Sequence, residues 1–319
     1  MTNGPFITLD NISVRLRDRL YLHNTSWQIN SNEHWAILGP NGSGKSTFAK
    51  SLFGEVPVVR GKIIYHFSGK EKNSPISISQ AIGYVSSELH RDIIERENLE
   101  DSFRDFSGKI DEVTRVKNVI AGGILKDATD MALLEKRLNN ITKKMGIESL
   151  LERDIKSLSI GEMNIALIVK ALIKRPKLLI LDEPFDGLDQ QARKSLAAII
   201  NELMQDNIRV ILITHRFEEI LPNITHVLFL KFGQVYKSGR KEDIFKPEVV
   251  KQVYEIEKRS ISNFPQKIKH SISVLEKKSP LPFQNEKSEP ARTLIEMKNV
   301  TVKYGQTVVL DKFNWAMRA

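Results

Sequence analysis

The sequence contains no cysteine, which excludes disulfide bonds and cysteine-based metal sites and allows a reducing compartment. It also lacks a long apolar run, because stretches such as residues 178–181 and 227–230 are far too short to cross a bilayer. Residues 1–5 lack the basic and then apolar pattern of a signal peptide. We therefore expect any role at a membrane to depend on a partner protein.

What is present describes a globular chain. Of its 319 residues 41% are hydrophobic and 27% charged, enough for one large domain with a substantial core and part of a second. The net charge of +9 is compatible with nucleic acid or an anionic membrane surface as a partner. A solvated, lysine-rich surface is the commoner cause, so the charge carries little weight.

The most informative stretch is Gly39-Pro40-Asn41-Gly42-Ser43-Gly44-Lys45-Ser46-Thr47, which follows the apolar run 35–38. It fits G-x-x-x-x-G-K-[ST] between a predicted strand and a predicted helix over 45–53. The glycines let backbone N–H groups approach a polyphosphate, and the helix N-terminus points further N–H groups at it. Lys45 supplies a positive charge for the β- and γ-phosphates, and the Ser46 hydroxyl a ligand for Mg²⁺. A glycine-rich turn without a ligand seldom carries this spacing, so the stretch predicts ATP-type nucleotide binding.

Strand and helix patterns alternate around this loop. Short strands are predicted at 6–9, 12–16, 25–29, 61–67, 82–85, 178–181 and 209–214, and helices at 163–174 and 190–205. The alternation favours an α/β fold with a largely parallel sheet. Residues 91–146 are polar and helix-forming, and they read as a helical subdomain inserted into the sheet domain. Their apolar stripe is predicted to be a core face rather than a ligand site; it consists of Met131, Leu134, Leu138, Ile141 and Met145.

Two acidic residues, Asp182 and Glu183, directly follow the predicted buried strand 178–181, and His215 follows the predicted strand 209–214. Ligands of open α/β sheets bind at the C-terminal ends of the strands. Asp182 is predicted to hold the Mg²⁺ shell, directly or through water, and Glu183 to polarise the attacking water as general base. Two buried acids are costly without a cation, which argues against a purely structural role. A lone histidine is more often structural, and only its position favours a contact of His215 with the γ-phosphate.

The stretch Ser159-Ile160-Gly161-Glu162 by itself describes an ordinary helix start. In its order relative to the other motifs, however, it completes a recognisable set. Over roughly residues 6–240 the chain resembles an ATP-binding-cassette (ABC) ATPase, which implies a P-loop cassette with a mostly parallel central sheet, an antiparallel β subdomain and a helical subdomain at about 91–175.

The resemblance implies a role for each motif. Lys45 lies in the phosphate loop, residues 159–162 form the signature, Asp189 belongs to the D-loop and His215 is the switch residue. In this family two cassettes dimerise head to tail. ATP then lies between the phosphate loop of one cassette and the signature of the other, and hydrolysis separates them.

The end of the chain repeats its beginning. Residues 294–300 mirror residues 6–12, and in the same register Val302 matches Val14 while Trp315 matches Trp27. We expect residues 1–240 to form the cassette, 241–292 a charged, partly helical linker, and 293–319 the first strands of a second cassette that is truncated. The tandem arrangement is similar to the molybdenum-transport or photorepair-like tandem ATPases.

Two departures from the family pattern affect its expected partners. Ser87, or Glu88 in a shifted register, stands where a loop glutamine usually helps order Mg²⁺ and couples to transmembrane partners. Leu16 stands where an aromatic ring often stacks on adenine, and the matching residue of the repeat is Tyr304. Coupling to a membrane partner and the contact with adenine are therefore left open.

The leading hypothesis is a Mg-ATP-hydrolysing component of a transport system, cytoplasmic or peripheral at the inner face of the membrane. Its expected partners are a second cassette, in cis or as a homodimer, and a membrane permease. One alternative is a soluble tandem ATPase that acts on the ribosome, nucleic acid or another target. Another is a nucleotide-binding fragment that is inactive without its second cassette.

Overall fold

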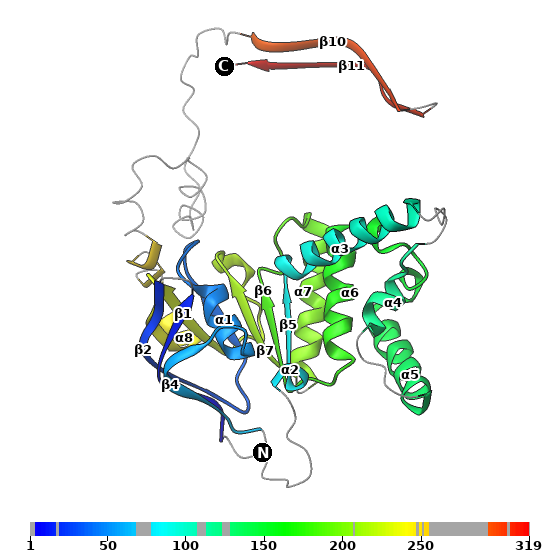
Figure 1. The fold of residues 1–319 in the computed structure, drawn as a ribbon. Coiled ribbons are helices and arrows are strands. Elements are labelled where there is room, and N and C mark those ends of the chain that lie inside the picture. The colour runs from blue at the N-terminus through cyan, green and yellow to red at the C-terminus, as the bar shows by residue number, and fades with distance from the viewer. Residues whose placement is uncertain are drawn as a thin grey trace. The chain divides into compact units, whose positions relative to one another are not determined.

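The computed structural model describes residues 4–16, 19–67, 78–106, 113–122, 128–206, 208–246, 249–250, 252–254, 293–304 and 307–318. The chain divides into two compact units, residues 1–263 and 264–319. At the centre of the first unit lies a six-stranded sheet of strand order β5-β6-β7-β3-β8-β9 (Figure 1). Its strands are β3 (Trp35–Leu38), β5 (Ile82–Ser86), β6 (Leu178–Asp182), β7 (Arg209–Thr214), β8 (His226–Lys231) and β9 (Gln234–Arg240). They run parallel except β9, which pairs antiparallel with β8.

A second, antiparallel sheet of order β2-β1-β4 forms the β subdomain. It consists of β1 (Pro5–Leu16), β2 (Arg19–Asn30) and β4 (Val58–Tyr65). The two strands expected at 6–9 and 12–16 are one continuous strand with an irregular register between Leu9 and Ile12. Asn11, at this irregularity, has a φ of 51°, so a local left-handed bend and not a chain reversal explains the polar residues there.

The described helices include α1 (Lys45–Phe53), α2 (Ile78–Ala81), α3 (Ser87–Phe106), α4 (Val116–Ala121), α5 (Ala128–Met145), α6 (Ile160–Leu172), α7 (Gln190–Gln205) and α8 (Lys241–Ile244). Short 3-10 turns lie at Glu148–Leu150, Ile155–Ser157 and Phe217–Glu219. The α6 helix begins three residues before its predicted start and ends before Pro176. Ser159 caps it, because its side chain accepts a hydrogen bond from the Glu162 N–H while Glu162 bonds the Ser159 backbone.

The central sheet separates two hydrophobic cores, because successive side chains of a strand point to opposite faces. Ile37, Ile180 and Ile211 face a core that includes Phe48 and Leu52 of α1 and the β subdomain. Their neighbours along the strands face the other core, which includes α6, α7 and the helical subdomain. Helices α1 and α6 therefore cover opposite faces of the central sheet.

The predicted apolar stripe of the helical subdomain is a core face. Leu134, Leu138 and Met145 of α5 are buried, and Ile141 packs against the same core. The side chain of Met131 lies outside the described part. A structural role for the stripe is thus confirmed for four of its five residues.

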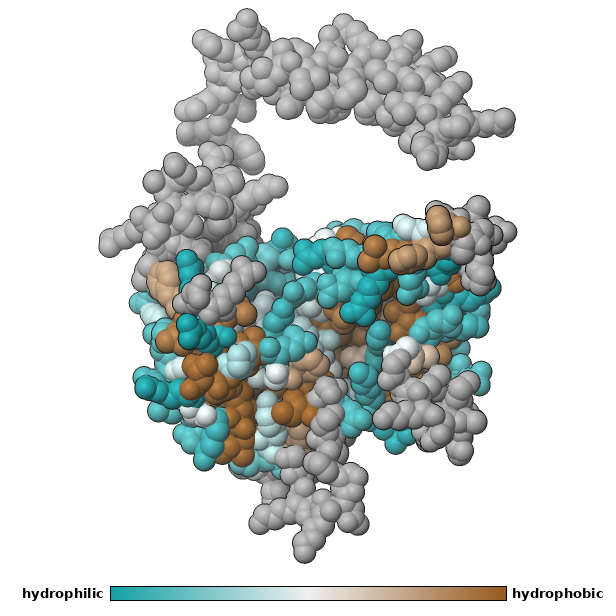
Figure 2. Space-filling model, in the orientation of Figure 1, coloured by the Kyte–Doolittle hydropathy of each residue, from teal (hydrophilic) through white to brown (hydrophobic). Residues whose placement is uncertain are grey.

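Some apolar side chains remain exposed on the surface. Figure 2 shows brown patches interrupting a mainly teal face, over the β subdomain and along the end of α3. Leu20 and Val59 of the β subdomain are exposed, and so are Leu99, Phe103 and Phe106 of α3. No helix among the described residues is both long enough and apolar enough to span a membrane.

The described part of the second unit is a hairpin of β10 (Thr293–Tyr304) and β11 (Thr307–Arg318). Met297 pairs with Trp315 and Tyr304 with Thr307. These pairs correspond to Leu9 with Trp27 and Leu16 with Arg19 in the first unit. The sequence repeat is therefore also a repeat of strand pairing. The predicted linker falls mostly outside the described residues.

Candidate nucleotide site

The phosphate loop joins β3 to α1 and exposes backbone N–H groups. Gly42 and Gly44 have φ values of 80° and 95°, in the left-handed region that glycine adopts without strain. Gly44 is the N-cap of α1 and provides no side-chain hydrogen bond to the first turn. The first N–H groups of α1 are thus available to an anion. A side chain at Gly39 would collide, since its Cβ would lie 2.3 Å from the carbonyl oxygen of Leu230.

Lys45 lies in the cradle that this loop forms. Its Nζ donates to the carbonyl oxygens of Gly39 at 2.9 Å and Pro40 at 3.2 Å, and it lies 3.5 Å from Oε1 of Glu183. The side chain is buried although it is charged. A buried ammonium group held by carbonyl oxygens and a carboxylate is placed to exchange these partners for phosphate oxygens.

Glu183 is held between a cation and a histidine. Its Oε2 lies 2.9 Å from Nδ1 of His215 and accepts a hydrogen bond from the backbone N–H of the same residue at 3.3 Å. Its φ is 51°, unusual for a residue with a side chain, while its N–H continues the sheet by donating to Ile213. Such strain is typical of residues whose direction matters at a functional site.

The His215 ring is oriented from both sides. Arg216 donates from Nε to Nε2 of His215 at 3.2 Å, so this nitrogen is an acceptor and Nδ1 carries the proton that Glu183 accepts. The hydrogen bond to Glu183, supported by the negative charges of Glu183 and Asp186, raises the pKa of His215 against the opposing effect of burial. Burial raises the pKa of Glu183, but the hydrogen bond from His215 and the charge of Lys45 outweigh it and hold that pKa below its ordinary value.

Asp182 ends β6 and is almost fully buried, with 5% of its surface exposed. Its Oδ2 accepts a hydrogen bond of 2.9 Å from the hydroxyl of Tyr84. Its Oδ1 is buried without a hydrogen bond of normal geometry from the described residues. Burial raises the pKa of Asp182, and the hydroxyl groups of Ser46 and Tyr84 oppose this rise.

The residues at this point suit a hard cation. Oδ1 of Asp182 is buried without a hydrogen bond of normal geometry among the described residues, and the Ser46 hydroxyl of the phosphate loop interacts with the same carboxylate. A carboxylate and a hydroxyl are the kind of oxygen donors that Mg²⁺ prefers. A second cluster, Glu183, Asp186 and His215, brings potential ligand atoms within 4.8 Å of one another. The ammonium group of Lys45, 3.5 Å from Glu183, opposes a cation there. The predicted ligands Ser46 and Asp182 therefore fit the ion better.

The signature residues lie on the other face of the sheet. Ser159 and Glu162 satisfy each other in the capping box, and Arg153 binds the Glu162 carboxylate at 2.7 Å. Gly161 allows α6 to approach α7 closely, since a Cβ there would lie 3.2 Å from that of Ala192. Among the described residues, no hydrogen bond or ion pair joins residues 159–162 to the phosphate loop, because α6 and α1 cover opposite faces of the sheet.

Asp189 caps the helix α7, where its Oδ1 accepts a hydrogen bond from the Ala192 N–H at 2.8 Å. Arg193, one turn into the helix, donates to the carbonyl oxygen of Phe185 and binds Glu219. Glu219 in turn accepts a hydrogen bond of 2.5 Å from Thr214, directly before His215. This network connects the loop before Asp189 to the residue that orients Glu183.

Two aromatic residues near the loop were not identified from the sequence. Tyr84 contacts Asp182, as described. The ring of Tyr21 packs on the phosphate loop, with Cδ1 about 3.5 Å from the position of a Cβ on Gly44. Leu16, at the position expected to contact adenine, lies exposed at the end of the first hairpin. Neither tyrosine belongs to a linear motif, so each can be identified as part of the site only from its contacts in the folded structure.

The expected loop-glutamine position is not a loop. Ser86 ends β5 and Ser87 begins α3 directly, so that Glu88 lies in the first turn of this helix. Glu88 forms an ion pair with Lys50 of α1. In the described structure, neither Ser87 nor Glu88 forms a hydrogen bond or ion pair with Asp182. The Glu88–Lys50 ion pair instead connects α3 to α1.

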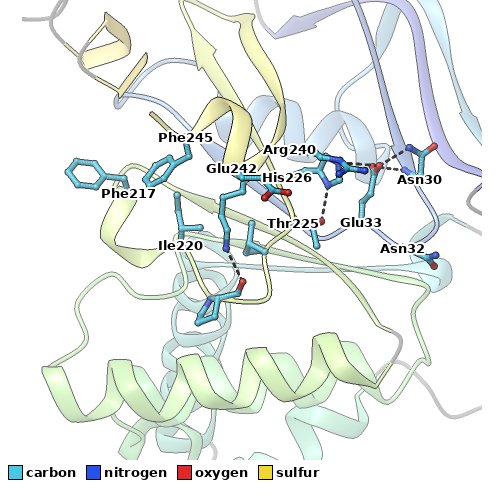
Figure 3. A pocket seen from close by; sticks show the side chains of 13 residues that line it. Asn30, Asn32, Glu33, Phe217, Ile220, Thr225, His226, Arg240, Glu242 and Phe245 are labelled. Carbon is cyan, nitrogen blue, oxygen red and sulfur yellow. Dashed lines mark hydrogen bonds and ion pairs between the residues drawn. The ribbon is translucent and has the colours of Figure 1, made fainter. Parts of the chain in front are cut away.

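A hollow of about 1020 Å³ lies elsewhere on the domain, between α8 and the turn at Phe217–Glu219 (Figure 3). Its buried acid, Glu33, is already bound by Asn30, by the indole of Trp35 and by His226 at 3.4 Å. Lys241 donates to the carbonyl oxygen of Pro222. Because these polar groups satisfy one another, the hollow is the weaker candidate for a ligand site despite its size.

Taken together, the fold and the loop define a P-loop nucleotide-binding domain. The ABC transporter family matches residues 22–186 of the chain. The chain is 32% identical to an uncharacterized ABC transporter ATP-binding protein, YmeB of Lactococcus lactis, over 82% of this chain and 96% of that protein. It is 34% identical to the ABC transporter ATP-binding protein ModF of Escherichia coli, over 74% of this chain and only 46% of that protein.

Among solved structures, cbiO1 of Clostridium perfringens, part of the ABC transporter complex cbiONQ, shares the fold. Its TM-score is 0.61 at 22% identity, over 86% of this chain and all of that one. The chain belongs to the ABC transporter ATP-binding family. The recognised family and the predicted fold class are thereby confirmed.

Proposed function

We propose that this chain binds and hydrolyses Mg-ATP as the ATP-binding component of a transport system. The observation that carries the proposal is the arrangement of Glu183, which lies between Lys45 and His215 and directly follows the buried Asp182. A depressed pKa keeps Glu183 ionised near neutral pH, as a general base for water requires.

Each residue of the site has a distinct task. The phosphate loop 39–47 and the N-terminus of α1 bind the phosphates, and Lys45 moves from the loop carbonyls to the β- and γ-phosphates. Bound Mg²⁺, held by Ser46 and Asp182, would neutralise charge on the phosphates. Glu183 accepts the proton of the attacking water, and His215 orients Glu183 through its Nδ1–H. The ring of Tyr21 gives the base or ribose an apolar surface beside Gly44.

Hydrolysis is proposed to need a second cassette. The signature residues 159–162 and the phosphate loop lie on opposite faces of one sheet, so a nucleotide on this loop reaches only the signature of another cassette. That cassette is either a second copy of this chain or a continuation of the unit that begins with the β10–β11 hairpin. Asp189, exposed at the start of α7, is proposed to lie at the same interface.

The molar mass of Glu183→Gln protein in solution, measured by light scattering with and without Mg-ATP, tests this assembly. A rise from monomer to dimer supports composite sites between two copies. A mass that stays monomeric, while ATP binding is confirmed separately, contradicts the homodimer and places the second cassette in a longer chain. Lys45→Ala protein is the matched control and should stay monomeric in both conditions.

The partner in transport is proposed to be a membrane permease, which places the chain at the inner face of the membrane. The related proteins support this role, since YmeB and ModF are named as ABC transporter ATP-binding proteins. One observation favours the alternative of a soluble tandem ATPase: no glutamine follows β5, and α3 begins there at once. Sedimentation with membranes supports the first role, and a salt-sensitive ribosome or nucleic-acid fraction the second.

A further inference from the structure

We propose that Tyr84 is a positioning residue for Mg²⁺, which fixes the carboxylate of Asp182 so that only Oδ1 faces the metal. The inference rests on the proposed Mg-ATP site and concerns a residue outside its motifs. It begins from the hydrogen bond of 2.9 Å between the Tyr84 hydroxyl and Oδ2 of Asp182.

The contact follows from the sheet. Strands β5 and β6 are parallel neighbours, with Tyr84 opposite Ile180 and Ser86 opposite Asp182. Residues 84 and 86 share one face of the sheet with residues 180 and 182, since side chains alternate along each strand. From its position two residues before the end of β5, the long phenol ring reaches the carboxylate at the end of β6. A smaller side chain at this position would not reach it.

The ring itself is held in place. It stacks on Phe53 at the end of α1, with 5.7 Å between the ring centroids and 29° between their planes. Phe53 and Tyr84 both line a groove of about 290 Å³ whose walls come from α1, β5, α3 and α6. The hydroxyl is therefore fixed by packing against the helix that starts at the phosphate loop. Its position does not depend on Asp182 alone.

The two oxygens of Asp182 thus have different tasks. Oδ2 is occupied by the phenol, while Oδ1 is buried without a hydrogen bond of normal geometry from the described residues. A carboxylate anchored through one oxygen cannot turn, so its other oxygen keeps one direction. Partners that orient a metal ligand in this way typically change metal affinity by about 10-fold to 100-fold when they are removed.

The geometry also explains how the site manages without a glutamine after β5. Ser87 and Glu88 occupy the first turn of α3, and Glu88 is engaged by Lys50. In the described part of the chain neither of them forms a hydrogen bond or ion pair with Asp182, whereas Tyr84 does so from within the strand. We infer that the orientation of the metal ligand is built into β5 and does not depend on the position of a mobile loop.

The test uses the whole chain and a non-hydrolysable fluorescent ATP analogue at trace concentration. Mg²⁺ is titrated, and its concentration at half-maximal fluorescence change is read for wild type and Tyr84→Phe. We expect this midpoint to rise roughly tenfold in Tyr84→Phe. Binding of the analogue in EDTA should not change, because the loop 39–47 makes the phosphate contacts.

The matched control is Tyr65→Phe, which removes the hydroxyl of another half-buried tyrosine. That hydroxyl donates to the carbonyl oxygen of Leu52 at 2.9 Å, a main-chain partner in α1 and not a proposed metal ligand. Its Mg²⁺ midpoint should equal that of wild type. A second variant, Phe53→Leu, loosens the Tyr84 ring but keeps the hydroxyl, and it should raise the midpoint by a smaller factor.

The possible failures are distinguishable. If wild type responds to Mg²⁺ and Tyr84→Phe has the same midpoint, the role of Tyr84 is refuted while the proposed function stands. If both tyrosine variants shift the midpoint equally, a general loss of packing explains the result and the inference is again overturned. If wild type binds the analogue without any response to Mg²⁺, the proposed metal site itself is wrong.

Discussion

Glu183→Gln is the substitution that tests the chemistry of the site most directly. Glutamine has nearly the same size as glutamate, and its amide oxygen can still accept the hydrogen bond from Nδ1 of His215, which spans 2.9 Å in the native protein. The change removes the negative charge and with it the ability to take a proton from water. Positioned general bases contribute about 10²-fold to 10⁴-fold to a rate, so ATP turnover should fall by that range. This corresponds to about 3 to 5 kcal/mol of barrier.

Binding of ATP should respond differently. The ion pair of 3.5 Å between Lys45 and Glu183 holds Lys45 in the loop, and the neutral amide weakens that hold. ATP affinity should therefore stay the same or increase. The pKa of His215 should fall from its raised position, because the hydrogen bond to the Glu183 carboxylate is the main cause of that rise.

Phosphate release at saturating Mg-ATP measures the turnover, equilibrium binding of ATP measures the affinity, and NMR titration of the imidazole measures the pKa. Glu218→Gln is the matched control, because it makes the same chemical change on an exposed residue of the neighbouring turn. Turnover of Glu183→Gln equal to that of the control would refute the general-base role. A loss of ATP binding that parallels the loss of turnover would show that the residue acts on binding instead.

Three further predictions concern other parts of the site. Lys45→Ala should abolish measurable ATP binding and leave the fold intact by circular dichroism; binding within twofold of wild type would contradict the phosphate contact. Since the pKa of His215 is raised above its ordinary 6.5, its protonation stabilises the folded state below about pH 6.5, and this contribution is lost as pH rises through the folded pKa. The difference in thermal stability between wild type and His215→Asn should accordingly be greatest at acid pH and become smaller as the pH rises. A difference that does not depend on pH would refute the stabilising protonation of His215. Ser159→Ala should lower the free energy of unfolding by about 1 kcal/mol, measured by urea unfolding, because it removes the cap of α6. Binding of ATP to the isolated chain should not change. A weakened affinity would mean that the signature contacts the nucleotide of its own cassette.

Linear motifs of the sequence were sufficient to predict the fold class and to indicate the main residues of the candidate site. The phosphate loop could be predicted because glycines, a lysine and a hydroxyl residue must be adjacent along the chain to wrap a polyphosphate. The acids at 182 and 183 were predictable because they directly follow an apolar strand. Alternating strands and helices indicated the α/β fold, and the register of the β10–β11 hairpin corresponds to the repeat that the sequence showed.

Only the tertiary structure decided which distant residues meet. Tyr84 contacts Asp182 across 98 positions of sequence, because two parallel strands lie side by side. The continuity of β1 and the helical start of α3 at Ser87 also depended on pairing and packing that no local pattern specifies. The separation of α1 from α6 by the sheet is likewise a consequence of topology. Ligand-binding residues that are close together along the chain can be recognised from their spacing in the sequence. The side chains that orient them are distant in sequence and come from whichever strand or helix packs beside them in the fold.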